Sequence, residues 1–217
     1  MEKIFTRPMA VLAAAIVAAA ANAQFVNPSF EDPALSPGGY TTNGINGWTA
    51  DLSASPLVGV WYSNAFSGPP PDGNQIGYTN SGAVAQQSSV DLSVGQTDLT
   101  MFFGHRSDGV FGIGTWELWA GGSVANGSVT GGTLLDSVKV DESTLPIGTF
   151  QQFDASYTAA AGDPLIGQLL TARLTLTGGT QMDFDLVALS VKPTPEPASM
   201  TVLGLGALAL LRRRKLR

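Results

Sequence analysis

The side chains that could transfer protons in this sequence are its carboxylates and one histidine. The chain has a single His among its 217 residues, so it cannot build a zinc site of the His-Glu-x-x-His kind, and a Ser-His-Asp triad would depend on His105 alone. His105 follows an apolar stretch and precedes the polar segment 106–109. That context is typical of a polar residue at a strand end that bonds to a loop, so we do not expect it to be catalytic.

Two pairs of acids lie close together in the sequence. Asp183 with Asp185, and Asp141 with Glu142, supply the paired carboxylates that glycoside hydrolysis needs. A glycosidase pair must flank a cleft several ångströms wide, and two neighbours on one strand are weak evidence for such a cleft. We therefore expect no catalytic residues and no enzyme, and we keep a glycan-active hydrolase as the less favoured alternative.

The body of the chain is strongly acidic. Residues 24–193 carry four basic and fifteen acidic side chains, which gives a net charge of −11. Such a surface repels phosphate backbones, so nucleic acid is not an expected partner. Divalent cations suit it better, and calcium accepts carboxylate and carbonyl oxygens without demanding a strict geometry.

Short β-branched and aromatic stretches recur between turns rich in Gly, Ser, Asn and Asp, and no helical period of useful length is present. In residues 174–177 Leu and Thr alternate, as in a half-buried antiparallel strand. The pattern predicts one all-β domain, an antiparallel β-sandwich, over residues 24–193. The expected strands are 57–62, 75–79, 84–90, 98–105, 115–120, 134–140, 150–157, 169–177 and 182–191, and 121–132 reads as a long hairpin tip or loop.

Exposed aromatic rings are the side chains that could stack on sugars. In residues 115–119 the alternation places Trp116 on the buried face and Trp119 on the outer face. Trp119, Trp61 and Tyr62 are the sugar-stacking candidates, with Tyr40 as a further ring. Trp48 is expected to pack in the core.

The two ends of the chain have the composition of targeting segments. Lys3 and Arg7 precede an apolar run of thirteen residues, 9–21, and Ala21 and Ala23 form a small-x-small cleavage site. This pattern predicts a signal peptide over residues 1–23, because a membrane-spanning helix needs roughly 20 apolar residues. With no Cys in the chain, the exported domain must be stabilised by its core, by strand pairing or by a bound metal.

At the other end, Pro195, Glu196 and Pro197 precede an uncharged run, 198–211, and the basic cluster Arg212, Arg213 and Arg214. A buried core helix with an exposed basic end would also fit the run by length. The order of parts resembles the PEP-CTERM sorting tail of Gram-negative bacteria, here residues 194–217. The resemblance implies a transient inner-membrane anchor with the Arg cluster in the cytoplasm. It further implies processing by an exosortase and release to the cell surface or extracellular matrix.

The body shows a second, looser resemblance. Residues 25–31 (Phe-Val-Asn-Pro-Ser-Phe-Glu), 45–48 (Ile-Asn-Gly-Trp) and 184–189 (Phe-Asp-Leu-Val-Ala-Leu) resemble the first and last strands of galactose-binding-like jelly rolls, which include many carbohydrate-binding modules. The resemblance implies that these strands are neighbours and that Glu31 and Asp185 hold a structural calcium ion. Leu186 stands where the family has a second acid, and solvated strand-end carboxylates are the alternative.

Together these features predict an exported, non-catalytic β-sandwich that associates with carbohydrate or exopolysaccharide. A structural matrix protein without a defined sugar site is the alternative.

Overall fold

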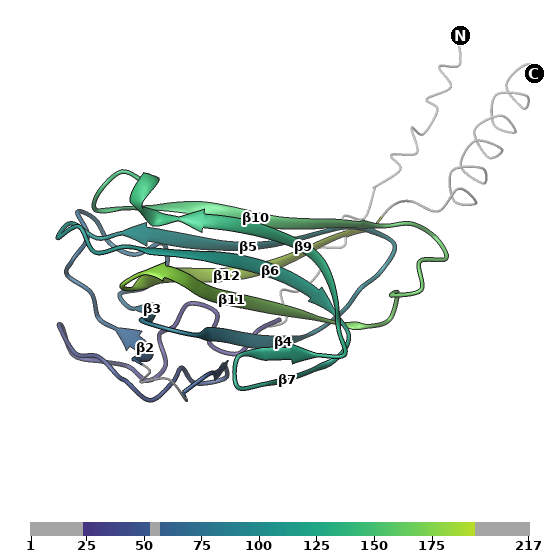
Figure 1. Ribbon diagram of the computed structural model, residues 1–217, viewed down its shortest axis with the longest axis horizontal. Helices are drawn as coiled ribbons and strands as arrows, with labels where there is room; N and C mark the ends of the chain where they lie inside the picture. The colour runs from purple at the N-terminus through teal and green to yellow at the C-terminus, as the bar shows by residue number, and fades with distance from the viewer. Residues whose placement is uncertain (1–23, 53–56, 194–217) are drawn as a thin grey trace, which may run out of the picture.

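The computed structural model describes residues 24–52 and 57–193, and the predicted signal peptide and sorting tail lie outside these ranges. The fold is all-β and antiparallel, as predicted (Figure 1). Its strands are β1 (Thr49–Ala50), β2 (Val58–Trp61), β3 (Ile76–Thr79), β4 (Ala83–Asp91), β5 (Gly95–His105), β6 (Gly112–Ala120), β7 (Ser123–Ala125), β8 (Ser128–Thr130), β9 (Thr133–Asp141), β10 (Thr149–Ala159), β11 (Leu169–Gly179) and β12 (Met182–Pro193). A single 3-10 turn, η1 (Glu142–Thr144), follows β9.

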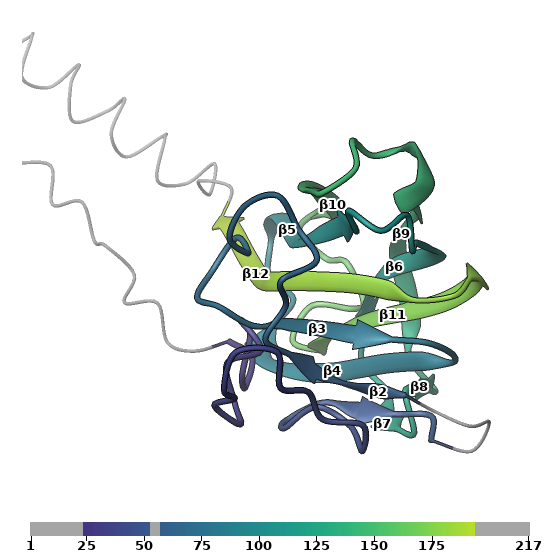
Figure 2. The same cartoon turned by 90° about the vertical axis from the view of Figure 1, so that its left-hand side faces the viewer.

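Two five-stranded sheets form the sandwich. One has the order β1-β4-β11-β6-β9 and the other β10-β5-β12-β3-β2. They lie face to face (Figure 1, Figure 2). We call the second one the β12 sheet.

Alternation along the strands builds the core between the sheets. Leu99, Met101 and Phe103 of β5 are fully buried, and the Phe103 ring meets Trp116 of β6 edge-on at 6.2 Å. Trp116 has no exposed surface, which confirms its expected place in the core. Burying a large apolar side chain contributes about 1.5–3 kcal/mol.

The segment predicted as a loop over 121–132 contains the short hairpin β7–β8. Its tip, Asn126-Gly127, has positive φ at both residues, and Gly127 donates its N–H to Thr49 Oγ1 and accepts from Arg173 Nε. Asn-Gly is the preferred dipeptide for such a tight turn. Three-residue strands are too short to stand out in a sequence pattern.

The N-terminal stretch that resembles a first jelly-roll strand forms turns instead of a regular strand. It nevertheless lies beside β12, because Val187 donates its backbone N–H to Pro28 O at 2.8 Å. Phe25 and Phe30 pack on the buried Trp48 ring, with centroids 5.9 and 5.6 Å away. Pro28 and the positive φ of Asn27 and Phe30 explain why the backbone cannot extend here.

Among the described residues there is no helix long and apolar enough to cross a membrane.

Candidate functional site

Strand β12 turns two acids away from the core. Phe184 belongs to the core between the sheets and is fully buried. Its neighbours Asp183 and Asp185 therefore point to the opposite, outer face of the β12 sheet. Both acids are nonetheless completely buried. The loop between β2 and β3 covers Asp185, because Asp72 of that loop donates its N–H to Asp185 Oδ2 at 2.9 Å.

Asp183 is held by one hydrogen bond and keeps one oxygen free. Gln181 Nε2 donates to its Oδ1 at 2.6 Å, and its Oδ2 has no hydrogen-bond partner among the described residues. Burial raises the pKa of Asp183 to about 7, against the opposing effects of the Gln181 hydrogen bond and the Arg106 charge. A carboxyl group with this pKa carries its proton in a large part of the molecules at neutral pH, so it can serve as a general acid.

A second buried carboxyl group, Glu142 of η1, fixes the backbone around Asp183. Its Oε1 accepts the Asp183 N–H at 3.0 Å, and its Oε2 accepts the Gly112 N–H at 2.6 Å. Burial raises the pKa of Glu142 to about 10, and the Asp183 charge adds to this effect. Glu142 is therefore neutral around pH 7 and ties the start of β12 to the start of β6.

A cavity of about 450 Å³ opens at Gln181, the hydrogen-bond partner of Asp183, and we call it the Trp61 pocket. It is lined by Gly38, Tyr40, Leu57, Trp61, Asn64, Tyr78, Asn80, Arg106 and Gln181. Gln181 both lines the pocket and bonds to Asp183, so it lies where the pocket meets the buried acid. The cavity has the size of a small-molecule site.

Aromatic rings and one cation form the pocket walls. The Arg106 guanidinium lies 4.8 Å from the centre of the Trp61 ring, and Asp108 holds it by an ion pair. Tyr78 OH donates to Thr41 O at 2.5 Å, and burial raises the pKa of Tyr78 to about 12. The pocket therefore offers flat aromatic surfaces, and Gln181 links it to an acid that is protonated in part at neutral pH.

The two predicted calcium ligands come close together, as the resemblance implies. Glu31 Oε1 accepts the N–H groups of Asn74 and Gln75, both at 2.7 Å, while Asp72 N–H bonds to Asp185. The same loop thus holds both carboxylates. Burial, with a smaller contribution from the charges of Asp72 and Glu31, raises the pKa of Asp185 to about 8, against the lowering effect of its hydrogen bonds to the backbone N–H groups of Asp72 and Leu186.

Carboxylate oxygens are the ligands that a hard cation accepts, and a bound positive ion would favour the charged form of the buried Asp185. No group of three or more His, Cys, Asp or Glu side chains among the described residues is arranged to hold a metal. Calcium would therefore need backbone carbonyls in addition to Glu31 and Asp185.

The sugar-stacking candidates do not lie together. Trp61 is a wall of the pocket and Tyr62 follows it at the end of β2. Trp119 lies on the outer face of the other sheet, but it is half-buried and donates from Nε1 to Glu117 Oε2 at 2.8 Å. Glu117 also pairs with Arg173 at 2.8 Å. Trp119 is thus part of a polar network and not a free ring.

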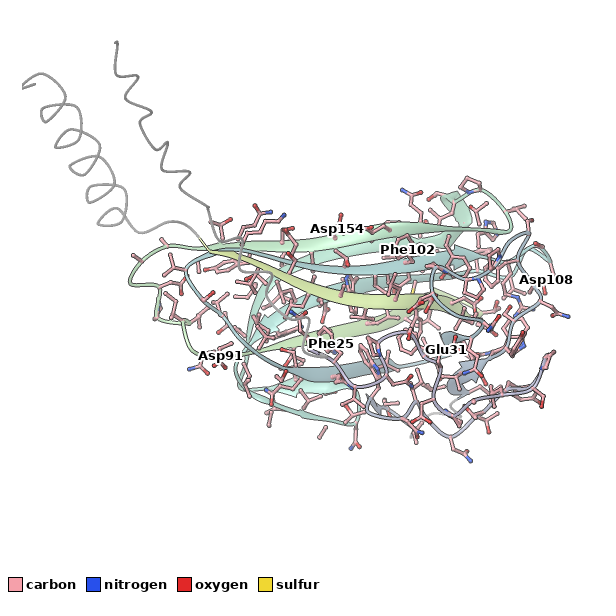
Figure 3. All side chains as sticks on the ribbon, turned by 180° about the vertical axis from the view of Figure 1, so that it is seen from behind. Phe25, Glu31, Asp91, Phe102, Asp108 and Asp154 are labelled. Carbon is pink, nitrogen blue, oxygen red and sulfur yellow. The ribbon has the colours of Figure 1, made fainter. Side chains whose placement is uncertain are left out.

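A second hollow lies farther along the β12 sheet, and we call it the Phe102 groove. Its volume is about 550 Å³, and it is lined by Ser67, Gly68, Pro69, Pro71, Phe102, Gly148, Thr149, Phe150 and Leu186. Figure 3 shows Phe102 on this sheet with Asp154 nearby on β10. Gln152 donates to Asp154 Oδ1 at 2.6 Å.

His105 is buried at the end of β5, with Nδ1 3.0 Å from Leu145 O. This agrees with a strand-end residue bonded to a loop.

The fold and pocket define an antiparallel β-sandwich with an acid-bearing cavity on one sheet. The profile of the HpiC1 cyclase-like family matches residues 21–190, and the chain belongs to this family. The PEP-CTERM protein-sorting motif matches residues 193–215. The protein is therefore an exported, exosortase-processed surface protein. Among curated proteins none matches the chain.

Solved structures include similar cyclases. The Stig cyclase Fisc from Fischerella sp. TAU, in complex with (3Z)-3-(1-methyl-2-pyrrolidinylidene)-3H-indole, is 23% identical, with a TM-score of 0.64 over 79% of this chain and 97% of that one. A cyclase from the same organism, in complex with 4-(1H-indol-3-yl)butan-2-one, is 22% identical, with a TM-score of 0.63 over 79% and 98%. The carbohydrate-binding module TmCBM61, in complex with beta-1,4-galactotriose, is more distant, at 16% identity and a TM-score of 0.45 over 78% and 98%.

Family membership corrects one expectation. The prediction that the protein is not an enzyme is wrong, because the matched family is one of cyclases. The sequence prediction rested on carboxylate pairs across a cleft. A single buried acid next to an aromatic pocket needs no partner to donate a proton.

The site residues predicted from the sequence did not include Gln181, Arg106 or Tyr78. One signal was available: Gln181, Asp183 and Asp185 recur at every second position, from the residue before the last strand into that strand. Polar residues that alternate with the apolar Met182 and Phe184 indicate a polar site on one face.

Proposed function

We propose that the Trp61 pocket binds a planar, π-rich ligand and that Asp183 transfers a proton to it. The observation that carries the proposal is the state of Asp183: it is buried, protonated in part at neutral pH, free at Oδ2, and linked to the pocket by Gln181. Such a group is a general acid placed beside a cavity.

The pocket walls support the choice of ligand. Trp61, Tyr40 and Tyr78 offer aromatic faces, and these favour stacked or edge-on contacts with another ring. The similar cyclases from Fischerella sp. TAU are complexes with indole compounds. An indole is therefore the first ligand class to test.

The reaction supported by this arrangement is an acid-promoted ring closure. The Asp183 O–H bond breaks and the proton adds to a carbon–carbon double bond of the ligand, which leaves a carbocation and the carboxylate. Attack by a second π bond closes the ring. Loss of a proton to the carboxylate then restores the neutral acid, so the step needs no oxidant or other reactant.

The proposal is tested with 4-(1H-indol-3-yl)butan-2-one, which we call the indole probe. Saturable binding measured by calorimetry, and deuterium incorporation at the carbon positions of the probe in D₂O above the buffer rate, would support it. Asp183→Asn should keep binding and lose the exchange. Asp91→Asn, an exposed acid on β4, is the matched control and should behave as the native protein. No binding of the probe would reject indoles as the ligand class.

We also propose that Glu31 and Asp185 hold a structural calcium ion. Their closeness, their shared contacts with residues 72–75 and the raised pKa of Asp185 support this. A bound cation would stabilise the loop that covers the β12 sheet, and thereby the wall between the Trp61 pocket and the Phe102 groove. Its role there is structural, and no catalytic step depends on it.

A second function, association with exopolysaccharide or a surface glycan, is favoured by the Phe102 groove. Phe102, Phe150 and two prolines give a CH-rich floor, and Gln152 and Asp154 are exposed polar groups on the adjacent strand. Apolar floors with polar edges suit neutral sugars. Retention of the protein on an exopolysaccharide column, lost in Phe102→Ala, tests this role.

For the chain's route we propose export from a Gram-negative cytoplasm with cleavage after Ala23. The apolar tail then anchors the protein transiently in the inner membrane, and an exosortase releases it.

A further inference from the structure

The Trp61 pocket lies at one end of the sandwich. Gln181 comes directly before β12, and Arg106 comes directly after β5. These strands are neighbours, and Asp183 pairs with Gly104 at this end. Figure 3 shows Asp108, the partner of Arg106, at the same extremity of the molecule. We call this the pocket end.

The described chain leaves the sandwich at the opposite end. β12 runs from Met182 to Pro193, and Pro193 pairs with Gly95, the first residue of β5. Twelve residues in a strand cover roughly 35 Å. Asp91 marks this far end in Figure 3, and Figure 1 shows β2 and β3 at the extremity away from it. We call it the tail end.

The sequence after Pro193 leaves little slack. Only four residues, 194–197, separate Pro193 from the apolar run that begins at Ala198. Even fully extended, that connection spans at most about 17 Å, and its prolines disfavour a compact fold-back. The tail end must therefore lie near the bilayer whenever the apolar run is inserted.

Charge disfavours a body that lies flat on the membrane. The domain between the two targeting segments has a net charge of −11. Contact of its long side with anionic headgroups would bring like charges together. An upright body reduces that contact to the tail end.

We propose that the anchored protein presents the Trp61 pocket away from the bilayer, so that ligands reach it from the extracytoplasmic side before and after exosortase cleavage. This inference rests on the proposed membrane anchoring of the tail. The tail then determines where the protein is held, and it does not change the access of ligands to the Trp61 pocket.

The absence of native cysteine allows a direct test. The mature chain, residues 24–217, is reconstituted in vesicles of phosphatidylcholine and phosphatidylglycerol that contain an energy-acceptor lipid. Ser107→Cys at the pocket end and Asp91→Cys at the tail end, both exposed positions, each receive one donor dye. We expect Asp91→Cys to show several-fold higher energy transfer to the bilayer than Ser107→Cys.

Flotation of the vesicles separates two kinds of failure. If both variants float with the vesicles and transfer energy equally, or if Ser107→Cys transfers more, the orientation is wrong while the anchoring holds. If neither variant floats, the anchoring is wrong and the orientation falls with it.

Discussion

Gln181 donates a 2.6 Å hydrogen bond to one oxygen of Asp183 and leaves the other oxygen without a partner among the described residues. Asp183 is completely buried, yet Gln181 also lines the Trp61 pocket. The pair therefore joins a carboxyl group that is protonated in part at neutral pH to a cavity with aromatic walls.

Removing the buried charge should stabilise the fold at alkaline pH. The pKa of Asp183 is about 7 in the folded chain, against about 3.9 for an unfolded Asp. Above pH 7 the folded protein must hold this carboxylate buried, so Asp183→Asn should raise the free energy of unfolding by on the order of a few kcal/mol at pH 9. Thermal melts at pH 5 and pH 9 check this, and an equal effect at both pH values would contradict it.

The stability of the whole domain should fall as pH rises. Glu142, Asp183 and Asp185 have raised pKa values of about 10, 7 and 8 in the folded chain. Between about pH 4 and these values the folded state binds more protons than the unfolded state, so the free energy of unfolding decreases with pH. Melting temperatures in calcium-free buffer from pH 5 to pH 10 measure the slope. A melting temperature that increases across this range would refute the raised pKa values.

Calcium should raise the melting temperature, because a ligand that binds only the folded state stabilises it. At a concentration one hundred times its Kd the gain is about 2.7 kcal/mol. Glu31→Gln and Asp185→Asn should each abolish the shift, while Asp91→Asn should keep it. Melts with calcium and with EDTA provide the measurement, and an unchanged melting temperature in native protein would mean that no calcium binds.

Loss of the Trp61 ring should weaken binding of the indole probe. The Trp61 ring forms a wall of the pocket and lies 4.8 Å from the Arg106 guanidinium. Trp61→Ala removes this stacking surface, so it should reduce the affinity for the probe about tenfold or more. Trp119→Ala is the matched control, because Trp119 bonds to Glu117 on the other sheet. Calorimetric titration measures the affinity of both variants for the indole probe. Equal losses of affinity in the two variants would point to a general defect in folding.

The sequence alone predicts the fold better than it predicts the site. Alternation such as Leu174 and Leu176 against Thr residues predicts strands because a strand's period is fixed by its own backbone. The PEP-CTERM tail is also readable, since its parts are contiguous. The Trp61 pocket is not, because Trp61, Arg106 and Gln181 meet only through strand order in the β12 sheet.

The burial of the acidic side chains could not be predicted from the sequence either. Asp183 and Glu142 look like ordinary surface acids in a chain with many of them. Their pKa values depend on the loop and the strand ends that cover them. The prediction that Glu31 and Asp185 hold calcium rests on the resemblance alone, because no local pattern relates two positions so far apart in the sequence.

The most direct test of the account is deuterium incorporation into the indole probe as a function of pH, in native protein and in Asp183→Asn. We predict that native protein catalyses the exchange below pH 7 and loses this activity as Asp183 ionises with its pKa of about 7. Asp183→Asn should bind the probe with unchanged affinity and show only the buffer rate. Exchange by Asp183→Asn at the native rate would contradict the assignment of Asp183 as the proton donor.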